Sequence, residues 1–433
     1  MVLIRSIRLG LLHVVAAITL VPITGVLNRL MIHEFGILAT VVAALVIAPY
    51  LLSPLQIWIG QYSDSHPLWG YRRTPYIALG LLLTVGGALL TPHAALLMEH
   101  AFGPGLLLAT LAFGLWGMGF NIATVAYLAL ASDLSSPEQR PRTVAVMWFM
   151  MISSVIVTAL LLGRALHDYT PARLIQVFNL LGGCALLLAA LGLIGLEPRS
   201  RQLRPQTRHS QRAAVRAVLH HPQARLFFIY LTLLLAAILG QDVLLEPFGA
   251  QAFAMPVSQT TRLTSLWGSA LLLALLLEGF VISRLLSKKA SAALGSTVAA
   301  GGLLLIAASG MLRLEALFLP GVFALGFGTG ISTAANLALM LDMTLPEQAG
   351  LFIGAWGVAD ALARGMGMLL AGVVRDLVTA LTGNATDGYV MVFLLEAGLL
   401  AISLALLPRL DVRAFRTRQP TLTELAALSG ETL

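Results

Sequence analysis

The chain has 433 residues, of which 58% are hydrophobic and only 11% charged, and its formal net charge is +7. A soluble globular domain usually carries about 25% charged residues, so the composition excludes a soluble protein and indicates one that is embedded in lipid. The positive charges are dispersed over short loops, which is typical of charges that set the orientation of membrane spans and contact anionic lipid headgroups. Their dispersal argues against a nucleic-acid partner.

Apolar runs long enough to cross a bilayer follow one another along the whole chain. Because the backbone must satisfy its own hydrogen bonds in hydrocarbon, each run is predicted to be a helix. The first run is expected to stay in the mature protein, since no small-residue cleavage site follows it. The fold class is therefore predicted as an all-α membrane protein of twelve transmembrane helices, at residues 9–28, 37–62, 74–97, 104–131, 142–166, 174–196, 225–248, 263–286, 291–310, 316–341, 349–378 and 387–408.

Lysine and arginine set the expected orientation. If the N-terminus is inside, 20 of the 27 basic residues fall in inner segments. Both termini are therefore predicted to be cytoplasmic. The remaining seven basic residues lie in outer loops or within spans, at Arg29, Arg164, Arg173, Arg262, Arg313, Arg364 and Arg375.

A loop that occurs twice is the most informative feature of the sequence. Residues 117–139 match residues 326–348 at 12 of 23 positions without a gap, at an offset of 209. The shared Asp and Pro-Glu-Gln are not explained by apolar bias. Two similar halves are typical of repeat-built transporters, and six plus six spans resemble the major facilitator superfamily. We expect an N-terminal half at 1–196, a basic cytoplasmic linker at 197–224, a C-terminal half at 225–408 and a cytoplasmic tail at 409–433.

The loop between the second and third expected spans resembles the cytoplasmic gate motif of that superfamily. The motif residues are Gly60, Asp64, Gly70, Arg72 and Arg73. Glycine lets helices approach closely, and the aspartate can attract an arginine or accept from a helix N-terminus. Five residues rather than two separate the aspartate from the second glycine, and the second half lacks the acid. The loop therefore either takes part in opening the cytoplasmic side or is a fixed structural contact without a gating role.

Acidic residues gather near the outer end of the seventh expected span. Asp242 and Glu246 are spaced to share one helix face, and Pro247 would kink or end the helix after them. Arg29 lies at a similar outer depth, so we expect an ion pair between Arg29 and Glu246. This group, with Gln241, is either a protonatable outer gate or a fixed salt bridge between the halves.

Three further acids fall within expected spans, where an isolated charge costs roughly 2.5–3.5 kcal/mol on insertion scales. Asp360 and Arg364 are spaced for an ion pair, which Glu396 could share. Glu278 is expected to contact Arg284 or a backbone amide, and it is the third candidate for a protonatable group. Structural pairing is the favoured interpretation of these residues.

Three motifs together give a more specific resemblance. They are Gln241-Asp-x-x-Leu-Glu-Pro-Phe-Gly249, the loop Gly70-Tyr-Arg-Arg-Thr-Pro-Tyr76, and Leu27-Asn-Arg-Leu-Met-Ile32. In their order along the chain, these motifs resemble those of the PucC-type family of phototrophic bacteria, and the resemblance covers essentially the whole chain. The resemblance implies a role in light-harvesting complex assembly or bacteriochlorophyll delivery, in the photosynthetic inner (intracytoplasmic) membrane. The implied partners are a chlorin pigment and nascent light-harvesting polypeptides or bacteriochlorophyll synthase.

The resemblance also implies a bound (bacterio)chlorophyll, held without a covalent link, whose magnesium takes an axial ligand. His13, Asn121 and Asn336 are the candidate ligands, although a polar residue within a span is more often a packing residue than a ligand. No catalytic residue and no metal site are expected, because the chain has one cysteine and shows no nucleophile–base pattern. Two other functions stay open: a proton-coupled transporter of a small solute using Asp242, Glu246 or Glu278, and a subunit of late bacteriochlorophyll biosynthesis.

Overall fold

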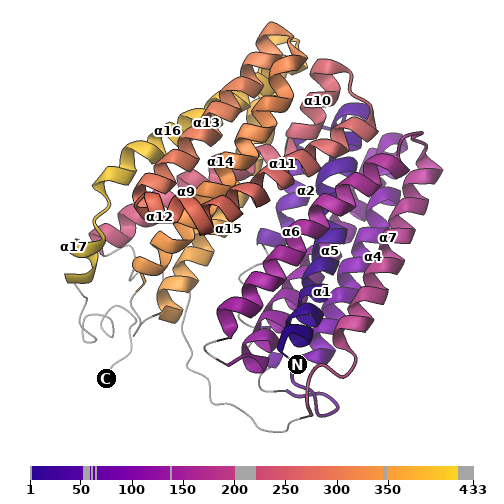
Figure 1. The fold of residues 1–433 in the computed structure, drawn as a ribbon. Coiled ribbons are helices and arrows are strands. Elements are labelled where there is room, and N and C mark those ends of the chain that lie inside the picture. The colour runs from indigo at the N-terminus through magenta and orange to yellow at the C-terminus, as the bar shows by residue number, and fades with distance from the viewer. Residues whose placement is uncertain are drawn as a thin grey trace, which may run out of the picture. The chain divides into compact units, whose positions relative to one another are not determined.

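The computed structural model describes residues 2–51, 59, 62–63, 66–136, 139–199, 221–344 and 349–417. Within these ranges eleven helices are long and apolar enough to cross a membrane. The second expected span is described only for its first part, α2 at Ala39–Leu51. The predicted all-α membrane fold is confirmed, and the described residues form long helices joined by short connections (Figure 1).

The chain divides into two compact units, one of residues 1–206 with 242–268 and one of residues 207–241 with 269–433. The predicted halves at 1–196 and 225–408 describe the sequence repeat and stay a prediction. The first unit contains α1 (Val2–Val21), η1 (Pro22–Leu27), η2 (Leu30–Glu34), α2, α4 (Thr74–His100), α5 (Phe102–Leu134), α6 (Arg140–Ala165), α7 (Pro171–Leu193), α10 (Leu245–Phe253) and the start of α11 (Val257–Leu277).

The second unit contains α9, the end of α11 and the helices that follow α11. These are α9 (Pro222–Gly240), η3 (Gln241–Val243, which crosses the unit boundary), η4 (Glu278–Ile282), α12 (Ser283–Leu285), α13 (Lys288–Leu312), α14 (Glu315–Asp342), α15 (Ala349–Thr382), α16 (Ala385–Leu406), η6 (Leu407–Arg409) and α17 (Val412–Thr417).

The first span is longer and less regular than expected. It runs from Leu3 to Glu34, and its second half contains two π-helical segments, η1 and η2. Pro22 begins η1, where its missing N–H removes a hydrogen bond from the ladder. Wider turns of this kind redirect side chains and are frequent at functional sites.

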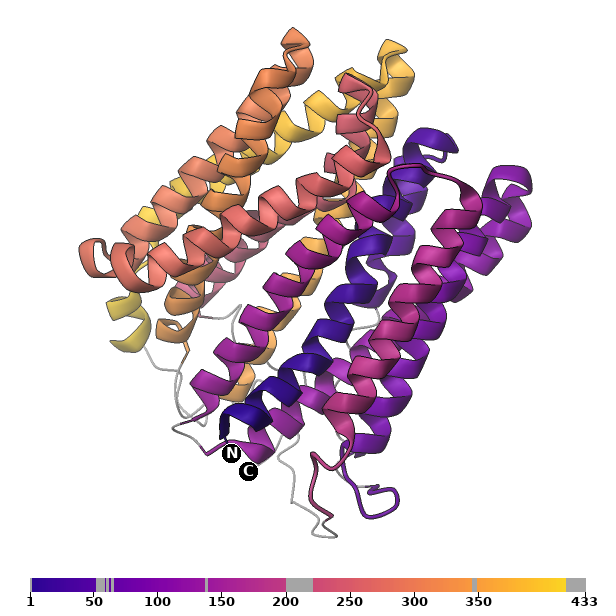
Figure 2. The same ribbon diagram turned by 45° about the vertical axis from the view of Figure 1, so that its right-hand side comes forward.

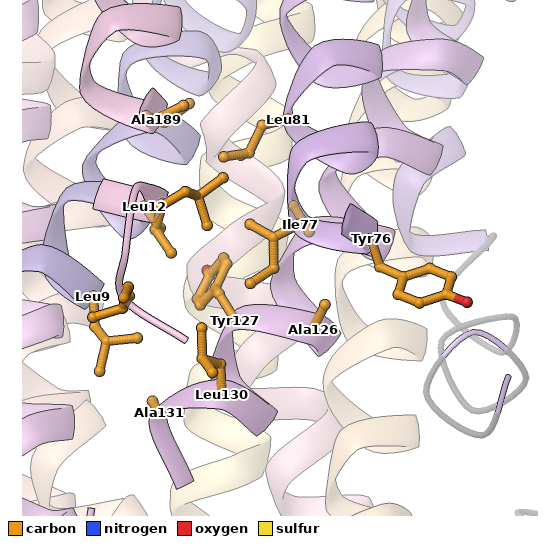
Figure 3. Close-up of a cluster of buried hydrophobic side chains, with 14 of the residues drawn as sticks. Leu9, Leu12, Tyr76, Ile77, Leu81, Ala126, Tyr127, Leu130, Ala131 and Ala189 are labelled. Carbon is orange, nitrogen blue, oxygen red and sulfur yellow. The ribbon is translucent and has the colours of Figure 1, made fainter. Parts of the chain in front are cut away.

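Buried apolar side chains of α1, α4, α5 and α7 form the core at one end of the first unit. Tyr127 of α5 lies at its centre, among Leu12, Ile77 and Leu130 (Figure 3). This core fixes the position of α1, which carries several of the polar residues considered below.

Glycines let one helix pair in each unit approach closely, and the two pairs use them in the same way. A Cβ on Gly80 of α4 would lie 2.5 Å from the backbone N of Ala123 of α5. A Cβ on Gly295 of α13 would lie 2.4 Å from the backbone N of Ser332 of α14. Ala123 and Ser332 are 209 residues apart, the offset of the repeated loop. The repeat is therefore visible in backbone packing as well as in sequence.

Candidate functional site

His13 of α1 lies between two aromatic rings from other helices of the first unit. The centroid of its imidazole is 5.4 Å from that of Tyr127 on α5 and 5.3 Å from that of Trp148 on α6. The side chain is only 7% exposed, and its Nδ1 is enclosed without a hydrogen-bond partner. An enclosed imidazole nitrogen with no partner is a group that a ligand could satisfy.

The surface beside His13 is apolar and open. Trp148 is half exposed although it contacts the imidazole edge-on. Val144, one helical turn before it on α6, is also exposed. A flat apolar molecule could lie on this face of α6.

The two asparagine candidates are both buried. Asn336 on α14 accepts a hydrogen bond from the hydroxyl of Tyr230 on α9, at 2.7 Å, and donates to the carbonyl and hydroxyl of Ser332. Its amide is thus satisfied by protein groups, which favours a packing role in the second unit. Asn121 lies on α5 of the first unit.

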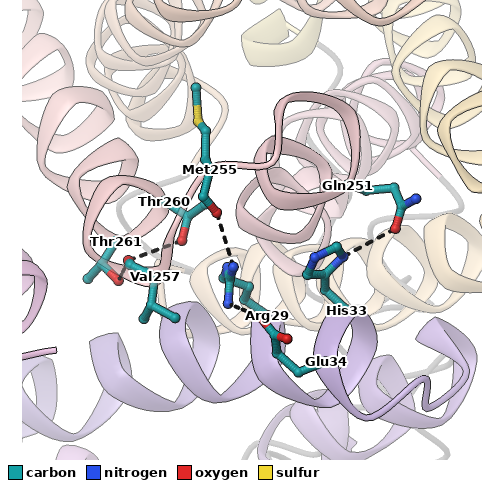
Figure 4. Close-up of polar contacts among 8 residues, drawn as sticks. All are labelled: Arg29, His33, Glu34, Gln251, Met255, Val257, Thr260 and Thr261. Atoms are coloured by element: carbon teal, nitrogen blue, oxygen red, sulfur yellow. Dashed lines mark hydrogen bonds and ion pairs between the residues drawn. The ribbon is translucent and has the colours of Figure 1, made fainter. Parts of the chain in front are cut away.

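Arg29 anchors a polar cluster near the far end of the first span (Figure 4). The side chain is 3% exposed, and its guanidinium donates to Glu34 Oε1 at 2.9 Å and to the carbonyl of Met255 at 3.1 Å. His33, one turn along the same helical segment, contacts Gln251 of α10 at 3.2 Å. The ion-pair partner of Arg29 is therefore Glu34 rather than the expected Glu246, because the π-helical turn of η2 brings Glu34 within reach.

Glu246 is buried in the same unit, against the π-helical part of the first span. A Cβ on Gly25 of η1 would lie 2.5 Å from Glu246 Oε1, so a larger residue there would require the carboxyl group to shift. Thr264 of α11 donates to the same oxygen at 2.7 Å, while Oε2 is enclosed without a partner. A carboxyl group with one enclosed, unpartnered oxygen is suited to carrying a proton.

The expected helix face shared by Asp242 and Glu246 does not exist. The helix α9 ends at Gly240, and the 3₁₀ turn η3 separates it from α10, which begins at Leu245. Pro247 therefore lies in the first turn of α10, where its missing N–H has no intrahelical partner to lose. The helix α9 therefore ends before both acids rather than after Pro247. Gln241 and Asp242 lie in the turn between the two helices, and Glu246 lies in α10.

The arginine-rich loop before α4 is held by an acid outside the predicted motif. Gly60 and Asp64 lie outside the described residues. Glu197, after α7, accepts from the backbone N–H groups of Arg72, Arg73 and Thr74 at distances of 2.7 to 3.1 Å. The guanidinium of Arg73 also lies 3.8 Å from Asp133 and donates to Ser63. Arg72 and Arg73 are thus tied to the ends of α7 and α5.

Of the three other acids within the expected spans, Asp360 has the partner that the sequence predicts, whereas the surroundings of Glu396 and Glu278 differ from the prediction. Asp360 and Arg364 form the predicted ion pair at 3.0 Å on α15. Glu396 is buried on α16, where a Cβ on Gly240 would lie 2.5 Å from its Oε1. Glu278 does not pair with Arg284. It begins the π-helical segment η4, where it is buried and its Oε2 has no partner.

Sequence reasoning missed Glu197, Glu34 and Thr264 as contributors. Glu197 was visible as the only acid of the segment 197–224, and a lone carboxylate beside six arginines is a candidate for ion pairs and charge-assisted hydrogen bonds. Thr264 and the proximity of Gly25 to Glu246 carry no sequence signal, because both depend on how α11 and η1 pack.

Comparison with solved structures supports the fold. The structure aligns with a bacterial homologue of the lysosomal transporter Spinster, inward-facing and unoccupied, with a TM-score of 0.71 at 14% identity, covering 96% of this chain and 99% of the other. It aligns with the nucleoside transporter NupG with a TM-score of 0.70 at 15% identity, covering 94% and 99%. At these identities the likeness establishes a major-facilitator-type fold and nothing about the cargo.

Comparison with known sequences is more specific. The chain is 35% identical to "Protein PucC" of Rhodobacter capsulatus over 93% of this chain and 91% of the other. It is 32% identical to the "Bacteriochlorophyll synthase 44.5 kDa chain" of Rhodobacter capsulatus over 88% and 89%. The family model described as "PUCC protein" matches residues 26–415. The chain therefore belongs to the PucC protein family, a family of photosynthesis-related membrane proteins.

Proposed function

We propose that this protein handles (bacterio)chlorophyll in the photosynthetic inner membrane, holding or delivering the pigment while light-harvesting complexes are assembled. The name of one relative, a chain of bacteriochlorophyll synthase, connects the family with this pigment. Nascent light-harvesting polypeptides or the synthase would be the partners, membrane lipid would surround the spans, and both termini would be cytoplasmic. Under this proposal the chain forms no covalent bond and has no catalytic residue.

The observation that carries the proposal is the environment of His13. A neutral imidazole is a good ligand for a metal such as the magnesium of a chlorin. Here it lies in a helix of the first unit, enclosed at Nδ1 without a partner and bordered by aromatic rings. When bound, the pigment would supply the magnesium and a large flat apolar surface. The chain would supply the imidazole, and Trp148 and Val144 would provide an apolar wall.

Asn336 is a weaker ligand candidate than His13, because Tyr230 and Ser332 already satisfy its amide. The glycines of α5 and α14 contact neighbouring backbones at several positions, so they support helix packing rather than a pigment. We therefore place the proposed ligand on α1 of the first unit.

Deletion of the gene in a phototrophic host tests the proposal. Antenna complexes and free pigment intermediates would be measured together in the same cells. We expect antenna complexes to fall while bacteriochlorophyll synthesis continues. Accumulated biosynthetic precursors would instead identify a subunit of late pigment synthesis, and unchanged antenna levels would contradict both.

A proton-coupled transporter is the second candidate, favoured by the buried carboxyl of Glu246 with its unpartnered oxygen. The fold, shared with solute transporters, is compatible with it. Solute uptake into pigment-free vesicles, driven by a pH gradient, would support this candidate. Loss of uptake in Glu246→Gln, with retention in a variant of the exposed Glu99, would locate the proton.

A further inference from the structure

Trp69 is an exposed aromatic side chain held in a constrained turn. It is 84% exposed, more than any other large hydrophobic residue among those described. Its φ of 52° lies in the left-handed region, and Gly70 after it has a φ of 83°. Leu68 and Tyr71 exchange two backbone hydrogen bonds of 2.9 Å across these residues. Two positive φ values between such a pair define a type I′ turn, which normally takes Asn-Gly rather than Trp-Gly.

The turn is braced on the side that leads to α4. The carboxylate of Glu197 caps the backbone N–H groups that follow Tyr71. The guanidinium of Arg199 lies over the ring of Tyr71, 5.5 Å from its centroid. Trp69 is therefore presented by a fixed backbone, so its exposure does not result from a loose chain.

A tryptophan in this position works against local stability. A side chain other than glycine is strained in the left-handed region, and the indole is left in contact with solvent. The turn would be more stable with glycine at this position. A strained backbone that presents an exposed aromatic side chain is typical of a binding site.

The position of the turn argues against lipid as the occupant. The helix α4 has 27 residues and is about 40 Å long, against roughly 30 Å of hydrocarbon in a bilayer. Its first turn therefore already lies at headgroup level. Figure 2 shows the loop before α4 extending beyond the ends of α1 and α6, away from the helices. The turn that carries Trp69 thus lies beyond the headgroup-level end of α4, in an arginine-rich part of the chain.

We propose that the turn at 68–71 is the docking site for a protein partner that offers an acidic segment with an apolar pocket for Trp69. Arg72 follows the turn directly in the sequence, and the side chain of Arg199 lies against Gly70 and Tyr71 of the turn. The carboxylate of Glu197 is occupied by the backbone N–H groups. The adjacent linker of this chain carries arginines at 201, 204, 208, 212 and 216, so like charge disfavours it as the occupant. This docking proposal is argued from the turn and its surroundings, and it does not depend on which molecule the protein carries.

Photo-crosslinking tests the proposed docking site. Benzoylphenylalanine would replace Leu68 in the full-length chain, and the crosslinking would be done in the membranes of a phototrophic host. We expect a discrete protein adduct that maps to an acidic stretch of the partner. Its yield should fall about tenfold or more when Trp69→Gly is added, as for a central anchor residue. It should also fall when salt rises from about 50 mM to about 500 mM, because the attraction between charges is screened. The same probe in place of Leu285, which is 76% exposed beside Arg284, should not give this adduct.

Trp69→Gly also separates a binding role from a structural one. Because glycine relieves the left-handed strain, the melting temperature of the purified chain should stay the same or rise while the adduct is lost. A lower melting temperature would show that Trp69 serves the fold and would overturn the proposal. Adducts with lipid alone, adducts within the same chain, or a yield insensitive to Trp69→Gly would overturn it as well.

Discussion

Gly119 and Gly328, 209 residues apart, hold corresponding positions in two separate helix pairs. Each lies against the backbone of the neighbouring helix, Gly119 against Gly80 of α4 and Gly328 against Gly295 of α13. A Cβ on Gly119 would lie 2.5 Å from the carbonyl oxygen of Gly80, and one on Gly328 would lie 2.6 Å from that of Gly295. Close backbone approach of this kind is the main way in which helices associate in lipid.

Substitution of either glycine by leucine should destabilise the protein by a similar amount. We expect about 1–3 kcal/mol for each, because the neighbour is backbone and cannot move aside as a side chain could. Thermal unfolding of the purified chain in detergent measures the effect. Gly114→Leu on α5 and Gly301→Leu on α13 are the matched controls, since nothing lies within 4 Å of a Cβ there. An equal loss in the controls would rule out backbone contact as the cause.

Gly25→Ala should destabilise the protein through Glu246. The new methyl group would meet the carboxylate, which Thr264 holds in place. We expect a cost of about 1–3 kcal/mol for the single substitution. Glu246→Ala in the same chain should make room for the methyl, so the double variant should be more stable than the sum of the single effects predicts. A coupling energy near zero in this double-mutant cycle would contradict the contact.

Glu197→Gln should weaken the start of α4. The carboxylate accepts from three successive backbone N–H groups at a helix N-terminus, and its charge also complements the helix dipole. We expect a loss of about 0.5–2 kcal/mol and faster proteolysis of the loop before α4. Glu99→Gln is the matched control at the opposite end of the same helix, where a negative charge is unfavourable. Its stability should be unchanged or slightly higher.

Tyr230→Phe separates packing from pigment binding at Asn336. Removing the hydroxyl leaves the Oδ1 atom of Asn336 without its donor. Hydrogen bonds between membrane helices are worth about 0.6 kcal/mol on average, so the melting temperature should fall slightly while chlorin content stays constant. An increase in bound chlorin would show instead that Tyr230 competes with pigment for Asn336.

Much of the fold could be predicted from the sequence, because lipid permits few structures. The spans follow from apolar runs, and the repeat at Asp133 and Asp342 indicates a duplicated unit. The pair of Asp360 and Arg364 was predictable because its geometry is set within one helix.

The contacts of the candidate site were less predictable than the fold, because they depend on places where the helices break or change to π-helical turns. The expected face of Asp242 and Glu246 assumed a continuous helix, whereas the chain turns at η3. The π-helical turns of the first span bring Glu34 to Arg29, which a regular-helix wheel does not show. The partner of Glu246 depends on packing between segments far apart in sequence, for which the residues involved give no local signal.

Chlorin content of the purified protein is the most direct test of the central claim. The full-length chain would be purified in detergent from a pigment-making host, and bound chlorin would be measured by absorbance per mole of protein for the wild type and for His13→Leu. His93→Leu is the control, because His93 is an exposed histidine on α4. The account predicts pigment in the wild type and in His93→Leu and its loss in His13→Leu at unchanged melting temperature. A wild-type protein that carries no chlorin, or a His13→Leu variant that carries as much as the wild type, would contradict it.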